Sequence, residues 1–200
     1  MQTIILASSS IYRRQLLDKL GIHYQWQAPD IDETPISGES PTALVKRLAQ
    51  SKAMALAQHY PTALIIGSDQ VAALENQILG KPGNHASAKA QLTMASGKKV
   101  TFFTGLALYN SATKSVQTCC ETYQVSFRPL TDAQIEDYLA REQPYDCAGS
   151  FKSEGLGIAL FDKLEGRDPN TLIGLPLITL IDMLHNEGVA ILGTKPDAAR

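Results

Sequence analysis

The sequence predicts an α/β fold built on a mixed, twisted β-sheet with flanking helices. Short apolar runs of strand length alternate along the chain with segments in which apolar residues recur at helical spacing. Two strand-like runs, 100–109 and 115–128, break this alternation, because a short polar stretch alone separates them. Such a pair predicts an antiparallel hairpin, so we expect parallel and antiparallel strands in one sheet.

The N-terminal region predicts a strand, a polar loop and a helix. Residues 3–7 form an apolar run that ends at the three serines 8–10. Leucines between positions 16 and 20 then share one face of a helix, and Gly21 is a stop signal for that helix.

The next helix begins at a clear boundary. After a connection rich in Pro, Asp, Glu and Ser, Ser40 has the features of an N-cap and Pro41 those of a first helical residue. We expect the helix to continue to about Tyr60, where a proline follows. A second buried strand is expected over 63–68, with Asp69 directly after its end.

The rest of the chain continues the alternation. We expect, in order, a helix over 86–96, the two hairpin strands with a turn at 110–114, a helix opened by a capping box at 131–134, a glycine-rich loop at 147–157, a strand over 158–161, a polar loop at 165–171 and a helix over 175–185. Residues 193–200 lack an apolar pattern, which predicts a mobile tail.

Charge and cysteine content exclude several classes of protein. The formal net charge of −2 argues against a dedicated binder of nucleic acid or of anionic membranes, which would carry a basic excess. Cys119, Cys120 and Cys147 are odd in number and two are adjacent, which is not the pattern of a disulfide framework or a CxxC metal site. The chain has no signal-peptide pattern and no apolar run long enough for a membrane span. We therefore expect a cytoplasmic protein without nucleic-acid or membrane partners.

Two charged residues stand where packing alone does not explain them. Lys52 falls in the middle of the apolar stripe of the helix that begins at Pro41, so its ammonium needs a partner or must extend to water. Asp69 follows a buried strand, and ligands of α/β sheets bind beyond such strand ends. A lysine stem packed beneath a solvated head group and an aspartate that caps its own turn are the structural alternatives.

The junction between the first strand and helix has the composition of an anion site. The serines 8–10 and the pair Arg13–Arg14 bring hydroxyls, free backbone N–H groups and guanidinium groups together. An ordinary serine N-cap with surface arginines is the alternative. The sequence lacks a P-loop, a GxGxxG fingerprint and an HExxH motif, and its histidines show no metal or triad spacing. Carboxylates combined with lysines and arginines remain, and these suit metal-assisted phosphate chemistry with Mg²⁺ or Mn²⁺.

Taken together, several segments resemble the Maf family of nucleoside triphosphate pyrophosphatases. The matching segments are ILASSSIYRRQLL (5–17), PDIDET (29–34), LAQSKA (48–53), IIGSDQV (65–71), GKP (80–82), TGLAL (104–108), CAGSFKSEGLGIALF (147–161) and EGRDPNTLIGLP (165–176). The resemblance implies one domain over 1–192 with two lobes around a deep cleft, similar in fold to the inosine-triphosphate pyrophosphatases.

The resemblance also implies a reaction and a set of residues. The family hydrolyses the α–β phosphoanhydride of a nucleoside triphosphate, which gives a monophosphate and pyrophosphate, with a divalent metal cation. Asp69 would be the proton acceptor, and Glu33 would act with it at the metal. The residues that would hold phosphate oxygens are Lys52, Lys81, Ser8, Arg13 and Arg14.

Three positions match the specificity determinants of one branch of the family. The pyrimidine-directed branch has Arg, Thr and Gln where this chain has Tyr12, Gln70 and Glu154, and the 7-methyl-GTP branch has an aromatic residue, Gln and Glu. A glutamate accepts from N1–H and N2–H of guanine, and the positive charge of 7-methylguanine favours a carboxylate and an aromatic face. The expected reaction is therefore hydrolysis of 7-methyl-GTP to 7-methyl-GMP, which removes a modified nucleotide from the pool.

Two alternative functions and four questions stay open. The chain could be a dTTP- or UTP-directed pyrophosphatase of the same family, or a non-catalytic nucleotide-binding regulator of cell division. Ile11 stands where the family usually has a proline, which would fix the start of the helix. A homodimer is also open, because the sequence does not give the oligomeric state. Neither does it give the preferred metal, nor whether Glu121 or Asp162 completes the metal site.

Overall fold

The computed structural model describes residues 2–75 and 77–193. Its strands are β1 (Thr3–Ala7), β2 (Gln25–Gln27), β3 (Ala63–Leu74), β4 (Gln77–Leu79), β5 (Lys99–Asn110), β6 (Ser115–Phe127) and β7 (Phe161–Gly166). Its helices are α1 (Ile11–Asp18), α2 (Pro41–Ala55), α3 (His85–Ala95), α4 (Asp132–Glu142), α5 (Asn170–Ile173) and α6 (Leu177–Asn186), with 3₁₀ turns η1 (Ala148–Ser150) and η2 (Leu156–Leu160).

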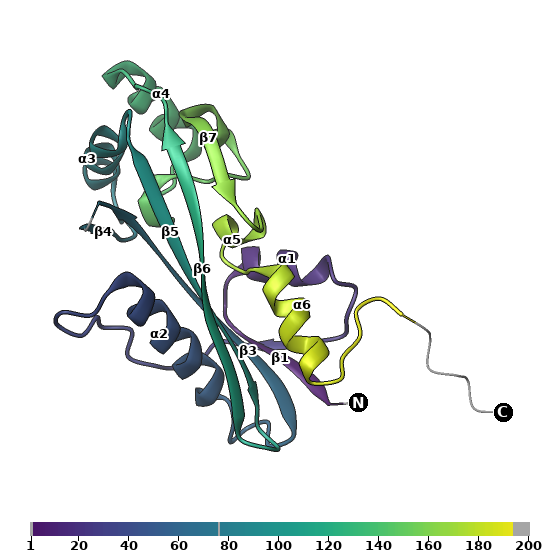
Figure 1. The fold of residues 1–200 in the computed structure, drawn as a ribbon. Coiled ribbons are helices and arrows are strands. Elements are labelled where there is room, and N and C mark those ends of the chain that lie inside the picture. Colours follow the sequence, from purple (N-terminus) through teal and green to yellow (C-terminus); the bar gives the residue numbers. More distant parts are fainter. Residues whose placement is uncertain (1, 76, 194–200) are drawn as a thin grey trace.

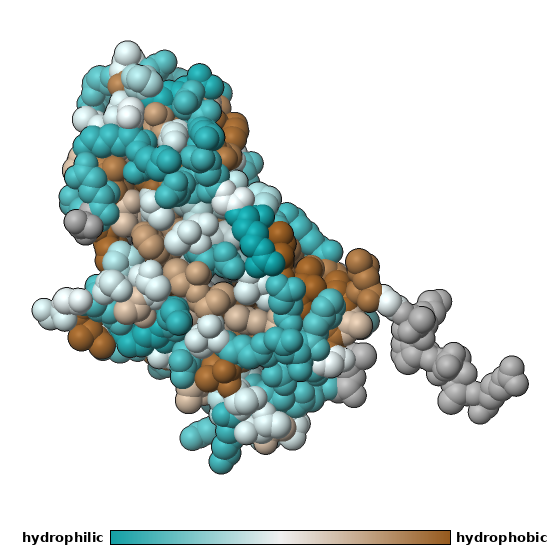
Figure 2. Space-filling view, in the orientation of Figure 1, coloured by the Kyte–Doolittle hydropathy of each residue, from teal (hydrophilic) through white to brown (hydrophobic). Residues whose placement is uncertain are grey.

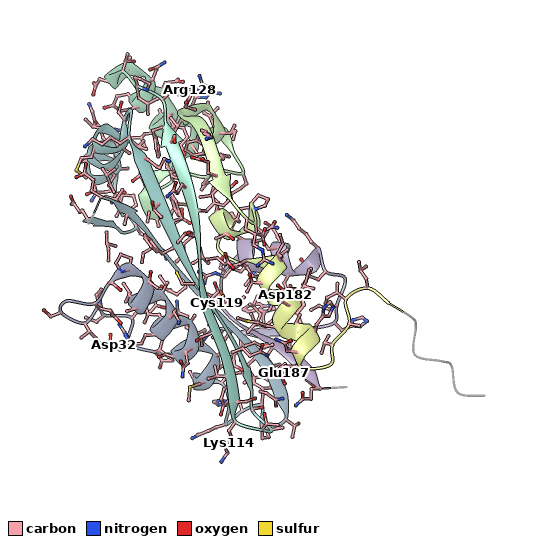
Figure 3. All side chains as sticks on the ribbon, viewed as in Figure 1. Asp32, Lys114, Cys119, Arg128, Asp182 and Glu187 are labelled. Atoms are coloured by element: carbon pink, nitrogen blue, oxygen red, sulfur yellow. The ribbon has the colours of Figure 1, made fainter. Side chains whose placement is uncertain are left out.

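All seven strands belong to one mixed sheet, as the sequence predicted. The order is β2-β1-β3-β5-β6-β7, and β4 pairs with the end of β3. Strand β1 runs parallel to both β2 and β3, whereas the other pairs are antiparallel. The strands β3, β5 and β6 are long enough to run the length of the molecule. Figure 3 shows this for β6, with Lys114 at the hairpin tip and Arg128 beyond the opposite end.

Helices cover the sheet on both faces at one end, and a second group of elements closes the other end. Figure 1 shows α2 on one side of the long strands and α1 with α6 on the other. The even-numbered residues of β3, such as Leu64 and Ile66, pack against α1 and α6. The odd-numbered Ala63 and Ile65 pack against α2. This is the period of two that a strand imposes on its side chains.

A further core fills the end of the molecule that carries α3, α4 and β7. Aromatic rings dominate it: Phe151 makes edge-to-face contacts with Phe102, Phe127 and Phe161, at centroid distances of 4.7–5.6 Å.

The surface between the two ends is less polar than its surroundings. In Figure 2, white and light-brown residues cross the middle of this face, between α2 and α3 of Figure 1.

Helix boundaries follow the capping residues that the sequence shows. Ser40 caps α2 with Pro41 at its first turn. Thr131 and Gln134 form the expected capping box of α4. Helix α2 ends at Ala55 rather than near Tyr60, because a hydrogen-bonded turn replaces its last residues. The helix at the C-terminal end begins at Leu177, and the short α5 precedes it.

Two sequence-based predictions about strands were wrong, and two short strands were missed. Strand β3 does not end before Asp69 but continues to Leu74, because β5 supplies an antiparallel partner along its whole length. The strand expected over 158–161 is mostly the turn η2, in which Ile158 is 54% exposed, and β7 begins at Phe161. The strands β2 and β4, with three residues each, were not predicted at all.

Two further expectations concern a mobile C-terminal tail and membrane-spanning segments. The predicted mobile tail lies almost wholly outside the described residues. Within 2–75 and 77–193, none of the helices combines the length and the apolar character that a bilayer crossing requires.

Candidate active site

The site forms where one edge of β3 has no neighbouring strand. Strand β1 pairs with β3 up to Gly67, and β4 pairs with it from Ala72 onward. The segment 68–71 lies between these two partners, so in the described chain this stretch of edge is open. The loop after β1 and the first turn of α1 lie beside it, because β1 is parallel to β3 and ends at the same level.

Helix α2 lies unusually close to the sheet next to this opening. A Cβ atom on Gly67 would lie 2.1 Å from the carbonyl oxygen of Ala49, and one on Gly105 would lie 2.0 Å from that of Val45. Two glycines on neighbouring strands thus let the helix backbone rest on the strand backbone. Lys52 lies one turn after Ala49. Its side chain is thereby directed to Asp69, which follows Gly67 by two residues and pairs opposite Gly105.

Lys52 is a buried ammonium held between two carboxylates. Its Nζ donates to Asp69 Oδ1 at 2.7 Å and lies 2.9 Å from Glu33 Oε1. Lys52 and Asp69 are each 7% exposed, whereas the side chain of Glu33 is 59% exposed. Lys52 therefore does not extend to bulk water, and Asp69 does not cap a turn of its own. The cluster brings together residues from α2, β3 and the loop before α2.

The loop that carries Glu33 is fastened to α2 by an arginine. Arg47 makes a two-pronged contact with Glu39, with both N–O distances 2.7 Å, and donates to the carbonyl oxygen of Thr34 at 3.2 Å. The hydrogen bond from Arg47 lowers the pKa of Glu39. Asp32 accepts from Thr34, which closes a short turn around Glu33 and lowers the pKa of Asp32. Glu33 thus lies in a turn whose Thr34 end is held by Arg47, and its carboxylate contacts Lys52.

Arg13 is the cation of α1 that faces the opening. Its backbone N–H donates to Ser10 Oγ, the N-cap of α1, and its Nε donates to the carbonyl oxygen of Gly174 at 2.9 Å. Burial lowers the pKa of Arg13, while the nearby charges of Asp69 and Glu33 raise it. With Nε engaged by the protein, the terminal nitrogens of this guanidinium are the groups available for an anion.

A cavity of about 390 Å³ lies beside this cluster and has the size of a small-molecule site. All three positions that the family resemblance assigns to base specificity, Tyr12, Gln70 and Glu154, line it. Arg13 and Lys81 line it too. Residues from the sheet, from α1 and from the loop after α4 therefore meet around one space. Burial raises the pKa of Tyr12, and Asp146 and Glu154 are among the charges that act on this ring.

Two of the residues predicted to hold phosphate oxygens, Ser8 and Arg14, do not line the cavity. Ser8 is 5% exposed and accepts from the backbone N–H of Ser10, so it shapes the loop, while Ser9 and Ser10 line the cavity. The guanidinium of Arg14 lies over the ring of Trp26, 4.2 Å from its centroid, and is not part of the cavity lining.

The two carboxylates fit a hard divalent cation that keeps most of its water. Asp69 and Glu33 point oxygen atoms at one cationic atom, Lys52 Nζ, and oxygen ligands are those that Mg²⁺ prefers. Among the described residues no group of three or more His, Cys, Asp or Glu side chains could hold a metal ion. Glu121 is not a third ligand here, because it accepts from Thr179 on α6, and Asp162 lies on β7.

Sequence reasoning missed the polar residues that hold the site from the other face of the sheet. Ser68 donates to the carbonyl oxygens of Gly105 and Gly174, both at 2.9 Å. Thr104, fully buried, donates to the carbonyl oxygen of Thr171. These contacts join positions far apart in the chain, so the local pattern gave no sign of them. Asp146, which also lines the cavity, lies in none of the matching segments, and Cys147 begins one of them without an assigned role.

The fold and the site together define a class of protein: an α/β protein with two carboxylates bridged by a buried lysine, beside a cavity of small-molecule size. The chain belongs to the Maf family: the family model described as "Maf-like protein" matches residues 3–187. A 7-methyl-GTP pyrophosphatase from Alcanivorax borkumensis is 61% identical over 189 residues, which is 94% of this chain and 96% of that protein.

A solved structure supports the fold assignment. The Ham1 protein of Staphylococcus aureus is similar with a TM-score of 0.54 at 13% identity, covering 93% of this chain and 100% of that one. This likeness concerns the fold alone.

Proposed function

We propose that this chain is a nucleoside triphosphate pyrophosphatase that hydrolyses 7-methyl-GTP to 7-methyl-GMP and pyrophosphate. The observation that carries the proposal is the buried Lys52 ammonium between Asp69 and Glu33, next to a cavity lined by Tyr12 and Glu154. The 61% identical relative bears the name of this activity over nearly the whole length of both chains.

The phosphate end of the site neutralises the triphosphate. Arg13 and Lys81 line the cavity and supply positive charge for phosphate oxygens. Charge develops on the leaving pyrophosphate as the bond between the α-phosphorus and the bridging oxygen breaks, and fixed cations stabilise it. Lys52 is already bound to both acids in the free protein, so it orients them and also adds a positive charge close to the reacting phosphate.

Asp69 is the proton acceptor in this proposal. A water molecule attacks the α-phosphorus, its proton passes to the Asp69 carboxylate, and pyrophosphate departs with the bridging oxygen. Lys52 holds Oδ1 of Asp69 at 2.7 Å, which leaves Oδ2 as the oxygen that receives the proton. The position of Asp69 in the middle of β3, paired opposite Gly105, keeps this carboxylate on rigid backbone.

Glu33 and Asp69 are the residues that would hold a divalent cation, Mg²⁺ or Mn²⁺. The cation, when bound, would supply further charge neutralisation at the phosphates. Two carboxylates are enough for such a cation, because it is commonly held by one or two carboxylates together with substrate phosphates and water.

We assign the acidic and aromatic residues of the cavity lining to the nucleoside. Glu154 and Asp146 both line the cavity, and Tyr12 contributes an aromatic ring to the lining. A carboxylate accepts from N1–H and N2–H of guanine, and the cationic 7-methylguanine ring is attracted to carboxylates and to an aromatic face. The cavity therefore offers negative charge to the base and positive charge to the phosphates.

We further propose that residues 1–192 act as one functional domain in the cytoplasm. Free Cys119, Cys120 and Cys147 agree with a reducing compartment.

Release of pyrophosphate from a nucleotide panel tests the proposal. With Mg²⁺ or Mn²⁺ we expect 7-methyl-GTP to be the preferred substrate over GTP, dTTP and UTP. Asp69→Asn should reduce turnover by at least about a hundredfold, since general base catalysis contributes 10²–10⁴-fold. Asp162→Asn, an exposed carboxylate on β7, is the matched control and should keep wild-type activity.

Other outcomes would favour the alternatives. A clear preference for dTTP or UTP would contradict the base assignment while keeping the reaction class. Nucleotide binding without turnover of any member of the panel would favour a regulatory binding protein.

A further inference from the structure

One buried aspartate ties the start of the segment 168–174, which contains α5, to the first turn of α6. Asp168 is 2% exposed, and its Oδ1 accepts from the backbone N–H of Asn170 at 2.8 Å. Its Oδ2 accepts from the backbone N–H of Ile178 at 2.8 Å, in the first turn of α6. The segment thus has a defined shape before any substrate binds. Its residues Leu172 and Ile173 line the cavity, but the proposed reaction assigns the segment no role.

Backbone carbonyl groups of this segment set the orientation of the Gln70 amide. Gln70 Nε2 donates to the carbonyl oxygen of Thr171 at 2.8 Å and to that of Leu172 at 3.2 Å. Carbonyl oxygens can accept and cannot donate, so the NH₂ end of the amide must face the segment. The oxygen end, Oε1, therefore points away from the carbonyl groups of Thr171 and Leu172 and lies near Gly174 and Arg13. Because Gln70 lines the cavity, this orientation decides which group the substrate meets.

Thr104 completes the arrangement from strand β5. Its hydroxyl donates to the carbonyl oxygen of Thr171 at 3.0 Å and accepts from Gln70 Nε2 at 2.9 Å. Because the hydroxyl proton of Thr104 is used in the bond to Thr171, the hydroxyl oxygen can only accept a hydrogen bond from Gln70. Thr104 is fully buried and is not part of the cavity lining, so it acts on the cavity through Gln70.

The same segment orients the phosphate-binding arginine. The carbonyl oxygen of Gly174 accepts from Arg13 Nε and from Ser68 Oγ, both at 2.9 Å. A Cβ atom on Gly174 would lie 3.4 Å from Arg13 Nε and 3.9 Å from Gln70 Oε1, which places that oxygen on the side of Arg13. The backbone of Gly174 has φ 117°, a value that favours glycine.

We propose that Thr104 is a positioning residue that, with the carbonyl groups of the segment 168–174, holds Gln70 Oε1 as a fixed hydrogen-bond acceptor for the nucleoside of the substrate. This inference rests on the proposed function and deepens it. 7-methyl-GTP carries further donors besides the N1–H assigned to Glu154, and the proposal concerns two of them: the exocyclic amino group of the base and the 2′-hydroxyl of the ribose. A substrate that lacks the donor leaves the oriented oxygen without a hydrogen-bond partner, and a site built to bind a substrate donor discriminates against analogues that lack it.

A comparison of 7-methyl-GTP with two analogues shows which of the two groups is the donor to Gln70. 7-methyl-ITP lacks the exocyclic amino group, and 2′-deoxy-7-methyl-GTP lacks one ribose hydroxyl. For the wild-type chain we expect kcat/KM to fall about tenfold for one of these analogues relative to 7-methyl-GTP. The analogue that falls identifies the donor. Equal kcat/KM for all three nucleotides would overturn the inference.

The variant Thr104→Val then tests the positioning role, because valine keeps the shape and removes the hydroxyl. We expect the ratio of kcat/KM between 7-methyl-GTP and the weaker analogue to shrink to within about twofold, mainly through KM. Thr104→Ser, which keeps the hydroxyl, should retain the wild-type ratio. Thr101→Val on the same strand, outside the cavity lining, is the matched control and should retain it as well.

The ratio does not depend on how much of the variant is folded. General damage to the fold lowers activity on all three nucleotides by one factor, so an unchanged ratio in Thr104→Val overturns the inference even when total activity drops. The same ratios are measured as dissociation constants by calorimetry. A chain that binds these nucleotides with the expected ratio and hydrolyses none of them contradicts the proposed function and supports the positioning role.

Discussion

Replacing Gly67 by alanine tests how helix α2 delivers Lys52 to the site. The added Cβ would lie 2.1 Å from the carbonyl oxygen of Ala49 and 2.9 Å from the backbone nitrogen of Ala53, both in α2. Ordinary contact begins near 3.4 Å, so the helix backbone must move away by about 1.3 Å. Neither partner is the end of a flexible side chain, so the strain cannot be relieved locally. Overpacking of this kind costs about 1–3 kcal/mol.

The measurement has two readouts. At about 2–4 °C per kcal/mol for a chain of this size, thermal unfolding of Gly67→Ala should shift downward by about 2–12 °C. A displacement of about 1 Å also moves Lys52 relative to Asp69, and misplacement on this scale reduces turnover by up to about a hundredfold. Gly80→Ala, where nothing lies within 4 Å of the added atom, is the control. Wild-type melting temperature and turnover in Gly67→Ala would refute the close approach of α2 to the sheet.

Three further predictions concern single positions. Ile11→Pro should raise the melting temperature by about 1–4 °C, since proline suits the first turn of α1 and Ser10 before it already has extended angles (φ −64°, ψ 119°); a lower melting temperature would contradict this. Thr131→Ala should cost about 1 kcal/mol in the free energy of unfolding through loss of the α4 capping box, as denaturant titration would measure, whereas Thr131→Ser should not. Burial, with help from Asp146, raises the pKa of Cys147 to about 12, so alkylation by iodoacetamide at pH 8 should be far slower in the folded than in the unfolded chain. Because the pKa of Cys147 is raised in the folded chain, its protonated thiol favours the folded state, and this contribution to stability is lost as the pH rises from the ordinary cysteine pKa toward the raised one. Equal alkylation rates in the folded and unfolded chains would contradict the raised pKa.

The sequence was informative where a residue conflicted with its local pattern. Lys52 interrupts an apolar stripe, and the structure shows the cause, because two carboxylates share its ammonium. The continuation of β3 past Asp69 could not be predicted in the same way. The polar Ser68, Asp69 and Gln70 end the apolar run, although the antiparallel partner β5 keeps the backbone extended. Polar residues stand in this strand because both of its faces hold parts of the site.

Contacts between distant positions explain most of what could not be predicted. The bond from Arg13 to the carbonyl oxygen of Gly174 spans 161 positions, and that from Gln70 to Thr171 spans 101. Both end on backbone carbonyl groups, which are the same for every residue type. Even a correct list of elements therefore leaves the orientation of Arg13 and Gln70 undetermined, since it depends on how α5 lies against β3.

Strand β3 divides the proposed work of the site between its two faces. Gly67 and Asp69 face α2, where the close helix approach and Lys52 prepare the carboxylate for the phosphate chemistry. Ser68 and Gln70 face the opposite way, where they bind the segment 168–174. A shift of β3 by one residue would exchange these sets, because side chains alternate along a strand. The eleven register pairs that β3 makes with β5 therefore fix both halves of the site at once, and a change that moves this register should impair phosphate chemistry and base selection together.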